Sequence, residues 1–165
     1  MKNAGLNKQK IDINDIWQQT CALYQQADIK TLCLNLQNNY QANVNLVLIL
    51  SILQNQGYQF TQNQLNDLLQ TVLAFSQQTT VLIRQARFNW QQYKNTAKPN
   101  DYLIVKKSLL ATELHFEQQE QKLIIELLNK ALASPLSYPP TLPPSSWYFA
   151  QQNIPTDKLN DLSFW

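Results

Sequence analysis

The feature that most constrains this fold is the segment VNLVLILSIL at residues 44–53, an apolar run interrupted only by Asn45 and Ser51. A helix that is apolar on nearly every side is stable only when other elements surround it. The run covers about half of the roughly 20 residues that a membrane-spanning helix needs, and polar amides flank it on both sides. It therefore predicts a central buried helix, residues 44–56, in the core of a soluble domain.

Composition supports a globular chain and argues against a nucleic-acid partner. The 165 residues include 44% hydrophobic residues, which allows a substantial core. The 23 Gln and 17 Asn are scattered through amphipathic patterns, so amides replace charged pairs on the solvated helix faces. A net charge of +2 supplies little of the counterion release that drives nucleic-acid binding. The N-terminus lacks the apolar region of a signal peptide, so we expect a cytoplasmic location.

The two cysteines carry little sign of chemistry. Cys21 and Cys33 lie on expected helices, with no histidine or second cysteine pair at zinc spacing. We expect buried reduced thiols, and a disulfide between them is the alternative. No basic neighbour is placed to stabilise a thiolate.

Several helix boundaries can be read from capping residues. The first helix should start near Asn14 or Asp15, and Asp28 is the expected N-cap of the second. Asn43 should cap the central helix, and Gly57 should end it in the left-handed conformation. The next helix should open with a capping box formed by two side chains, Thr61 and Gln64.

The second half of the domain is expected to contain an arginine-bearing helix and one long helix. In residues 81–94 the apolar side chains should form the buried face, while Arg84 and Arg87 fall towards the other side. The expected apolar face consists of Leu82, Ile83, Ala86, Trp90 and Tyr93. Residues 101–133 contain no Gly or Pro and predict one long helix, although the polar stretch at 117–122 allows a bend or a second short helix.

The C-terminal part changes in composition. Residues 134–146 contain five prolines and predict an extended linker. The aromatic tail that follows could pack back on the bundle or dock on a partner or a second copy of the chain. Its candidate docking residues are Trp147, Tyr148, Phe149, Phe164 and Trp165.

Together these patterns predict an all-α, single-domain bundle of about five to seven helices around the central helix, with a Pro-rich C-terminal extension. We expect a polar N-terminal lead-in at 1–13, a helical domain at 14–133, and the linker and aromatic tail at 134–165.

Several short motifs resemble a small, uncharacterised proteobacterial family known only as a domain of unknown function. The resemblance covers roughly residues 14–94 and involves CLNLQ at 33–37, the segment VNLVL at 44–48, and Arg84 and Arg87. Asn43 stands where that family tends to have Asp, and Leu82 replaces a Pro. The Asn keeps the capping role but removes a carboxylate. The resemblance implies a bacterial protein and a fold, without an activity.

The candidate binding residues are polar side chains in or beside these motifs: Gln37, Asn43, Asn45, Arg84 and Arg87. An unpaired amide inside an apolar helix costs about 1 to 3 kcal/mol, so Asn45 must bond to a backbone group or to Gln37, or else line a pocket. Arg84 and Arg87 could bind an anion, or could pair with acids such as Asp28 or Asp67.

No catalytic set is recognisable. His115 is the only histidine and lacks the carboxylate spacing of helical metal sites, and the two glycines exclude the usual phosphate loops. We expect no metal and no cofactor. Our leading hypothesis is a non-enzymatic protein-interaction or regulatory module. The alternative is a protein that binds a small anionic molecule, or an unfamiliar enzyme, with a pocket between the central helix and the arginine helix.

Overall fold

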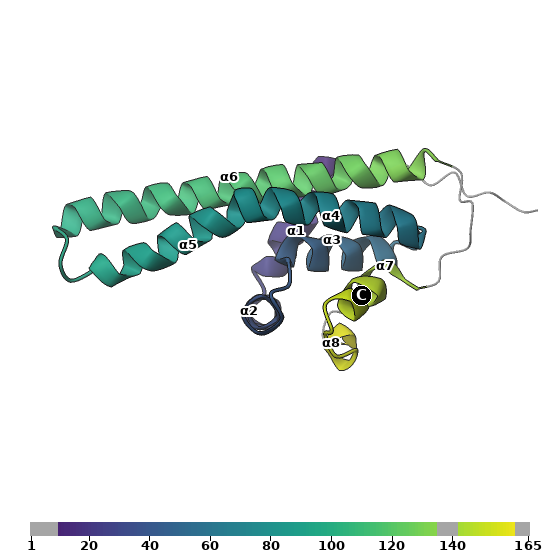
Figure 1. Cartoon of the computed structure of the whole chain (residues 1–165), viewed down its shortest axis with the longest axis horizontal. Helices are drawn as coiled ribbons and strands as arrows, with labels where there is room; N and C mark the ends of the chain where they lie inside the picture. Colours follow the sequence, from purple (N-terminus) through teal and green to yellow (C-terminus); the bar gives the residue numbers. More distant parts are fainter. Residues whose placement is uncertain (1–9, 135–141, 161–165) are drawn as a thin grey trace, which may run out of the picture.

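The structure, a computed structural model, describes residues 10–134 and 142–160, and within these residues every regular element is a helix. Figure 1 shows α6 along one side of the molecule, with α4 and α5 beside it and the shorter helices gathered under one end. The elements are α1 (Ile13–Tyr24), α2 (Ala27–Tyr40), α3 (Val44–Asn55), α4 (Gln62–Gln78), α5 (Thr80–Trp90), the 3-10 turn η1 (Gln91–Tyr93), α6 (Pro99–Leu132), α7 (Pro144–Gln151) and α8 (Asp157–Asn160). The predicted all-α, single-domain bundle is confirmed.

Helix α3 is the centre of this bundle. Every residue from Asn45 to Leu53 is buried, and α1, α2, α6 and α7 all contact the helix. The side chain of Asn43 accepts a hydrogen bond from the Leu46 amide at 3.0 Å, which satisfies one of the free amides at the helix start. Gly57, with φ 76°, follows its end. Both predicted boundaries of α3 are therefore confirmed.

The other caps agree with the sequence in one case and differ in two. Thr61 and Gln64 form the predicted capping box at the start of α4. Helix α1 begins slightly earlier than expected, because Asp12 caps it by accepting a hydrogen bond from the Asp15 amide at 2.8 Å. Asp28 is not the N-cap of α2: the helix starts at Ala27, so Asp28 lies in its first turn. An acidic residue there still interacts favourably with the helix dipole.

Helix α5 and the N-terminal half of α6 form a two-helix arm that extends beyond the bundle in Figure 1. The expected buried face of α5 is correct only at Ile83 and Trp90, which are half-buried. Leu82 is 61% exposed, and Ala86 and Tyr93 are also exposed. Arg84 and Arg87, which were expected on the other side, are half-buried. At the tip of the arm, Trp90 stacks on Tyr102 with ring centroids 5.8 Å apart.

Helix α6 continues through the polar stretch at 117–122 as one 34-residue helix. The helix does not bend to bring these polar side chains to the solvent. Glu120 and Gln121 are instead buried and hydrogen-bonded inside the bundle. Within this stretch, Glu120 and Gln121 therefore face the polar interior, whereas Gln119 and Lys122 are exposed.

Helix α7 belongs to the core. It starts at Pro144, inside the segment expected to be extended, since a proline is favourable in the first turn of a helix. Trp147, Tyr148 and Phe149 are buried in the main hydrophobic cluster, and α7 packs against α3. These three aromatic side chains are therefore not available to a partner in this conformation. Phe164 and Trp165 lie outside the described residues.

Candidate functional site

A cavity of about 960 Å³ is lined by residues of α1, α2 and the start of α3 on one side and of α4, α5 and α6 on the other. Pockets for small molecules commonly measure about 300 to 1,000 Å³ and are lined mainly by apolar groups with a few convergent polar ones. The cavity combines both kinds of lining. Its apolar part includes Trp17, Leu34, Leu110 and Leu114, and its polar part is a cluster of amides, carboxylates and guanidinium groups.

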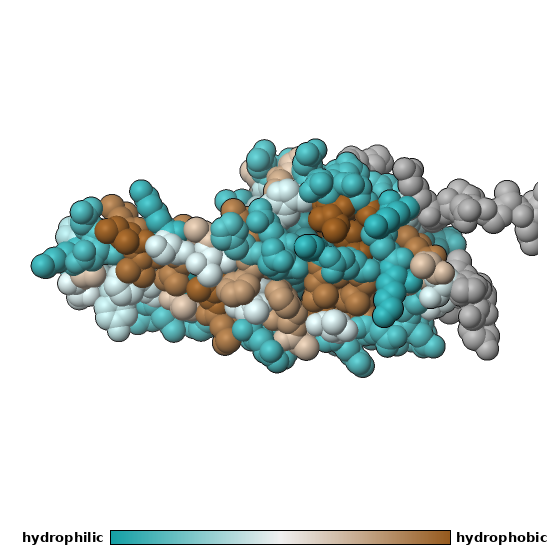
Figure 2. Space-filling model, turned by 90° about the horizontal axis from the view of Figure 1, so that it is seen from above, coloured by the Kyte–Doolittle hydropathy of each residue, from teal (hydrophilic) through white to brown (hydrophobic). Residues whose placement is uncertain are grey.

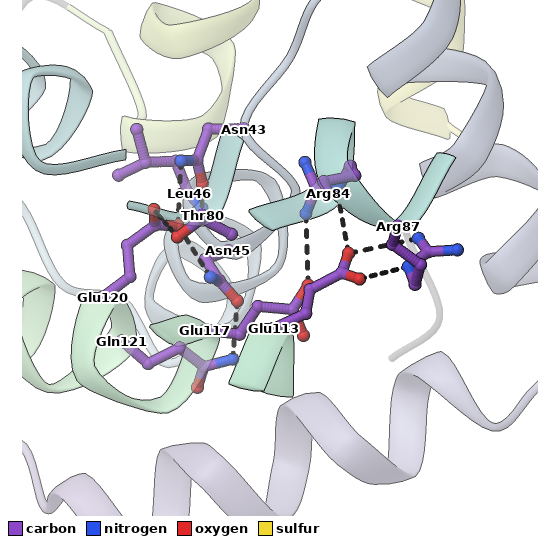
Figure 3. Close-up of polar contacts among 10 residues, drawn as sticks. All are labelled: Asn43, Asn45, Leu46, Thr80, Arg84, Arg87, Glu113, Glu117, Glu120 and Gln121. Atoms are coloured by element: carbon purple, nitrogen blue, oxygen red, sulfur yellow. Dashed lines mark hydrogen bonds and ion pairs between the residues drawn. The ribbon is translucent and has the colours of Figure 1, made fainter. Parts of the chain in front are cut away.

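The structure brings the five candidate binding residues of the sequence to this one cavity. They come from three separate parts of the chain, yet Gln37, Asn43, Asn45, Arg84 and Arg87 all contribute to its wall. Gln37 is half-buried and takes no part in the hydrogen bonds of the polar cluster among the described residues. The other four belong to two separate groups of polar contacts, which Figure 3 shows.

The first group is centred on the carboxylate of Glu120, which is only 1% exposed. Glu120 Oε1 accepts hydrogen bonds from Asn45 Nδ2 at 2.7 Å and from Asn43 Nδ2 at 2.9 Å. Its other oxygen accepts one from the Thr80 hydroxyl at 3.2 Å. All three donors are neutral, so a fully buried carboxylate is held here without an ion pair among the described residues.

Gln121 extends this group across the bundle. Its Nε2 donates to Asn45 Oδ1 at 2.8 Å, and its Oε1 accepts from the Thr20 hydroxyl at 3.1 Å. The amide of Asn45 is thus satisfied by α6, and not by a backbone group or by Gln37 as the sequence suggested. Because every member has a partner, this network connects α1, α3, α5 and α6 without leaving an orphaned polar atom.

The second group is an ion-pair cluster between α5 and α6. Arg84 Nε donates to Glu113 Oε1 at 3.0 Å, and Arg84 Nη2 donates to Glu117 Oε1 at 3.2 Å. Arg87 donates to both oxygens of Glu113, through Nε to Oε2 and through Nη2 to Oε1 at 3.2 Å. The expected partners of these arginines, Asp28 and Asp67, are wrong. The acids on α6 occupy both guanidinium groups.

The pKa values of the two acids in this cluster are shifted in opposite directions. Burial alone would raise the pKa of Glu113, but the hydrogen bonds and charges of Arg87 and Arg84 outweigh it and lower that pKa below 4.5. For Glu117, burial dominates and raises the pKa above 4.5, with help from the negative charges of Glu113 and Glu120 and against the pull of Arg84. One carboxylate is therefore well compensated by its cations, and the other is not.

Sequence analysis missed the four acidic and amide residues of α6 that complete the site: Glu113, Glu117, Glu120 and Gln121. A signal for them was present. Their spacing of four, three and one continues into Ile124 and Leu128, which are buried on the same helix. A polar side chain that falls on the apolar stripe of a helix is a candidate for a buried network, and this pattern identifies all four.

The remaining reactive side chains do not form a catalytic set. His115 is exposed on α6, where its Nδ1 lies 3.4 Å from Gln118 Oε1, and it does not line the cavity. Both cysteines are free thiols, and burial raises the pKa of Cys33 to about 12. Within residues 10–134 and 142–160, no group of three or more His, Cys, Asp or Glu side chains could hold a metal ion. In the same part of the chain, none of the helices combines the length and apolar character needed to span a bilayer.

Comparison with known proteins identifies the family. The chain belongs to the family described as a protein of unknown function (DUF2390), whose sequence profile matches residues 15–124. This match extends beyond the motifs that suggested a resemblance and includes most of α6, with the acids that pair with Arg84 and Arg87. No curated protein and no solved structure matches the chain significantly.

Proposed function

We propose that this protein is a non-enzymatic binding protein of the bacterial cytoplasm and that the cavity between α1–α3 and α4–α6 is its ligand site. The observation that carries the proposal is the convergence of Gln37, Asn45, Arg84 and Arg87 on one cavity of about 960 Å³. A structural role alone would be met by a close-packed junction, since protein interiors leave few voids larger than a water molecule. The free thiols of Cys21 and Cys33 are in keeping with a reducing compartment.

A fragment screen by NMR, with one cavity-filling variant, tests this proposal. Cys21 lines the cavity and its thiol makes no hydrogen bond among the described residues, so Cys21→Phe should fill space without breaking the polar network. Ala22→Phe places the same side chain at an exposed position of the same helix. We expect fragments that shift the amide signals of cavity residues in the wild type and in Ala22→Phe, but not in Cys21→Phe. If no fragment shifts these signals, or if Cys21→Phe leaves the shifts intact, the cavity is not a binding site.

A second candidate function, a protein-interaction module, is favoured by the surface of the arm. Most of the large exposed apolar side chains among the described residues lie on α5, η1 and the N-terminal half of α6: Val81, Leu82, Phe88, Tyr93, Leu103, Ile104, Leu110 and Leu114. Figure 2 shows apolar side chains gathered along the arm. Large apolar side chains that gather on an exposed surface can mark an interface.

Arm substitutions can test this second function without disturbing the cavity. Leu82→Glu and Leu103→Glu change exposed side chains that do not line the cavity. If the arm is an interface, sedimentation velocity of the wild type or cross-linking in cells should detect a complex that both variants lose. A wild type that is monomeric and forms no cross-linked complex would exclude this function.

A further inference from the structure

The polar interior of the cavity holds one more negative group than positive ones. Two guanidinium groups, Arg84 and Arg87, face three carboxylates, Glu113, Glu117 and Glu120. Glu113 accepts from both arginines and receives three of the four guanidinium hydrogen bonds in the cluster. An anionic ligand would have to compete with Glu113 for these cations, so the expected anion site is already occupied by the protein itself.

Lys30 also lines the cavity but does not remove this excess. Its side chain is exposed, and its Nζ lies 6.0 Å above the ring centroid of Tyr24. No carboxylate lies within ion-pair distance of it among the described residues. A solvated ammonium at the rim contributes little at the buried carboxylates, because water screens its charge.

Glu117 is the carboxylate with unused capacity. It accepts one hydrogen bond from Arg84 through Oε1, and its Oε2 makes none within the described part of the chain. Its side chain is 33% exposed, so a ligand in the cavity can reach it. Burial raises its pKa, and the neighbouring charges of Glu113 and Glu120 act in the same direction. A positive charge placed beside Glu117 would relieve this unfavourable environment.

The wall opposite Glu117 suits the rest of such a ligand. Trp17 and Tyr24 of α1 line the same cavity, and the faces of aromatic rings attract cations. Glu117 is near enough to α1 for its charge to raise the pKa of Tyr24, after the larger effect of burial. Leu34, Leu110 and Leu114 give the rim of the cavity an apolar surface.

We propose that the cavity binds an organic monocation, an amine with an apolar body, whose ammonium group lies at Glu117 between the α6 carboxylates and the aromatic side chains of α1. This inference rests on the proposed function, since it names the ligand class of the same cavity. The ammonium donates to the free oxygen of Glu117, and the apolar body lies against the leucines of the rim. Neither Glu113 nor Glu120 has to release its present partners.

Three probes of nearly the same shape test the charge of the ligand: tryptamine, which is a cation, tryptophol, which is neutral, and indole-3-acetate, which is an anion. Binding is measured by NMR titration of the full chain at neutral pH. A hydrogen bond between two charged groups is stronger than one to a neutral hydroxyl, so we expect tryptamine to bind at least about tenfold more tightly than tryptophol, and indole-3-acetate to bind most weakly.

Two matched variants localise the effect. Glu117→Gln should reduce the tryptamine affinity about tenfold and leave the tryptophol affinity nearly unchanged. Glu126→Gln, on an exposed face of the same helix, should change neither. A tryptamine preference that survives Glu117→Gln would overturn the assignment of Glu117.

The possible failures are distinguishable. If the three probes bind with similar affinity, and all lose binding in Cys21→Phe, the cavity is a ligand site but the cationic class is wrong. If none of them shifts the signals of cavity residues at millimolar concentration, while other fragments do, the ligand class is again wrong and the proposed function stands. If neither the probes nor the fragments shift these signals, both proposals fail.

Discussion

The α3 core and the α5–α6 arm are stabilised in opposite ways. In the core, nine consecutive residues of α3 are buried, and helices from both ends of the chain pack around them. In the arm, the contact between the helices includes partly buried ion pairs, while large apolar side chains face the solvent. The comparison shows that one chain can use apolar burial for stability in one region and leave apolar surface free in another. The cavity lies where these two regions meet.

The largest expected difference between the two regions comes from truncating a leucine in each. Leu50 is fully buried in α3, so Leu50→Ala should lower the free energy of unfolding by about 2 to 5 kcal/mol. Leu82→Ala on the arm removes the same atoms from a side chain that is 61% exposed, and should change the free energy of unfolding by less than about 0.5 kcal/mol. Urea denaturation of both variants measures the effect. Equal losses would contradict the contrast.

The next effect concerns the ion pairs of the arm. Glu113→Gln leaves the half-buried guanidinium group of Arg87 without a carboxylate and leaves Arg84 with Glu117 alone, and it should cost about 1.5 to 3 kcal/mol at neutral pH. The pKa of Glu113 is lowered in the folded state. Its contribution to the free energy of unfolding is therefore fully present above pH 4.5 and is lost as the pH falls through the lowered pKa. The difference in unfolding free energy between wild type and variant should therefore shrink in acid. A difference that is constant down to the acid transition would refute this interpretation.

A smaller loss is expected where α7 joins the core. The hydroxyl of Tyr148 accepts a hydrogen bond from the Asn43 amide at 2.8 Å, directly before the start of α3. Tyr148→Phe keeps the buried ring but removes the acceptor, and should cost about 1 kcal/mol. Tyr93→Phe, at an exposed position near the tip of the arm, is the matched control and should have no measurable effect. Thermal unfolding distinguishes the two variants.

The smallest effect on stability is expected at Glu117, and its dependence on pH should be opposite to that of Glu113. Its pKa is raised in the folded state, so its ionisation lowers stability as the pH rises from 4.5 through the raised pKa. Glu117→Gln removes this penalty and also loses a partly exposed ion pair with Arg84, so the net change should stay within about 1 kcal/mol. Relative to wild type, the variant should gain stability as the pH rises in that window. A change parallel to that of Glu113→Gln would show that the two carboxylates are equivalent.

The sequence predicted the core better than the site because the two depend on different signals. The burial of α3, its Asn43 cap and the capping box of α4 follow from residues a few positions apart. The orientation of α5 does not follow from nearby residues. Assigning its apolar residues to the buried face placed Leu82 inside and Arg84 outside. The acids that reverse this arrangement lie 26 to 33 residues further along the chain. Five residues of the cavity wall could be named in advance, but the cavity exists only through the packing of helices that are distant in sequence.

The most direct test of the cavity as a cation site is a crystal structure of the protein with bound tryptamine. We expect electron density for the indole in the cavity, between Trp17 and the rim leucines, with the ammonium nitrogen about 2.7 to 3.2 Å from a Glu117 oxygen and the Arg87–Glu113 pair intact. A structure in which α1 packs directly on α6 without a cavity, or in which tryptamine binds elsewhere on the surface, would contradict it.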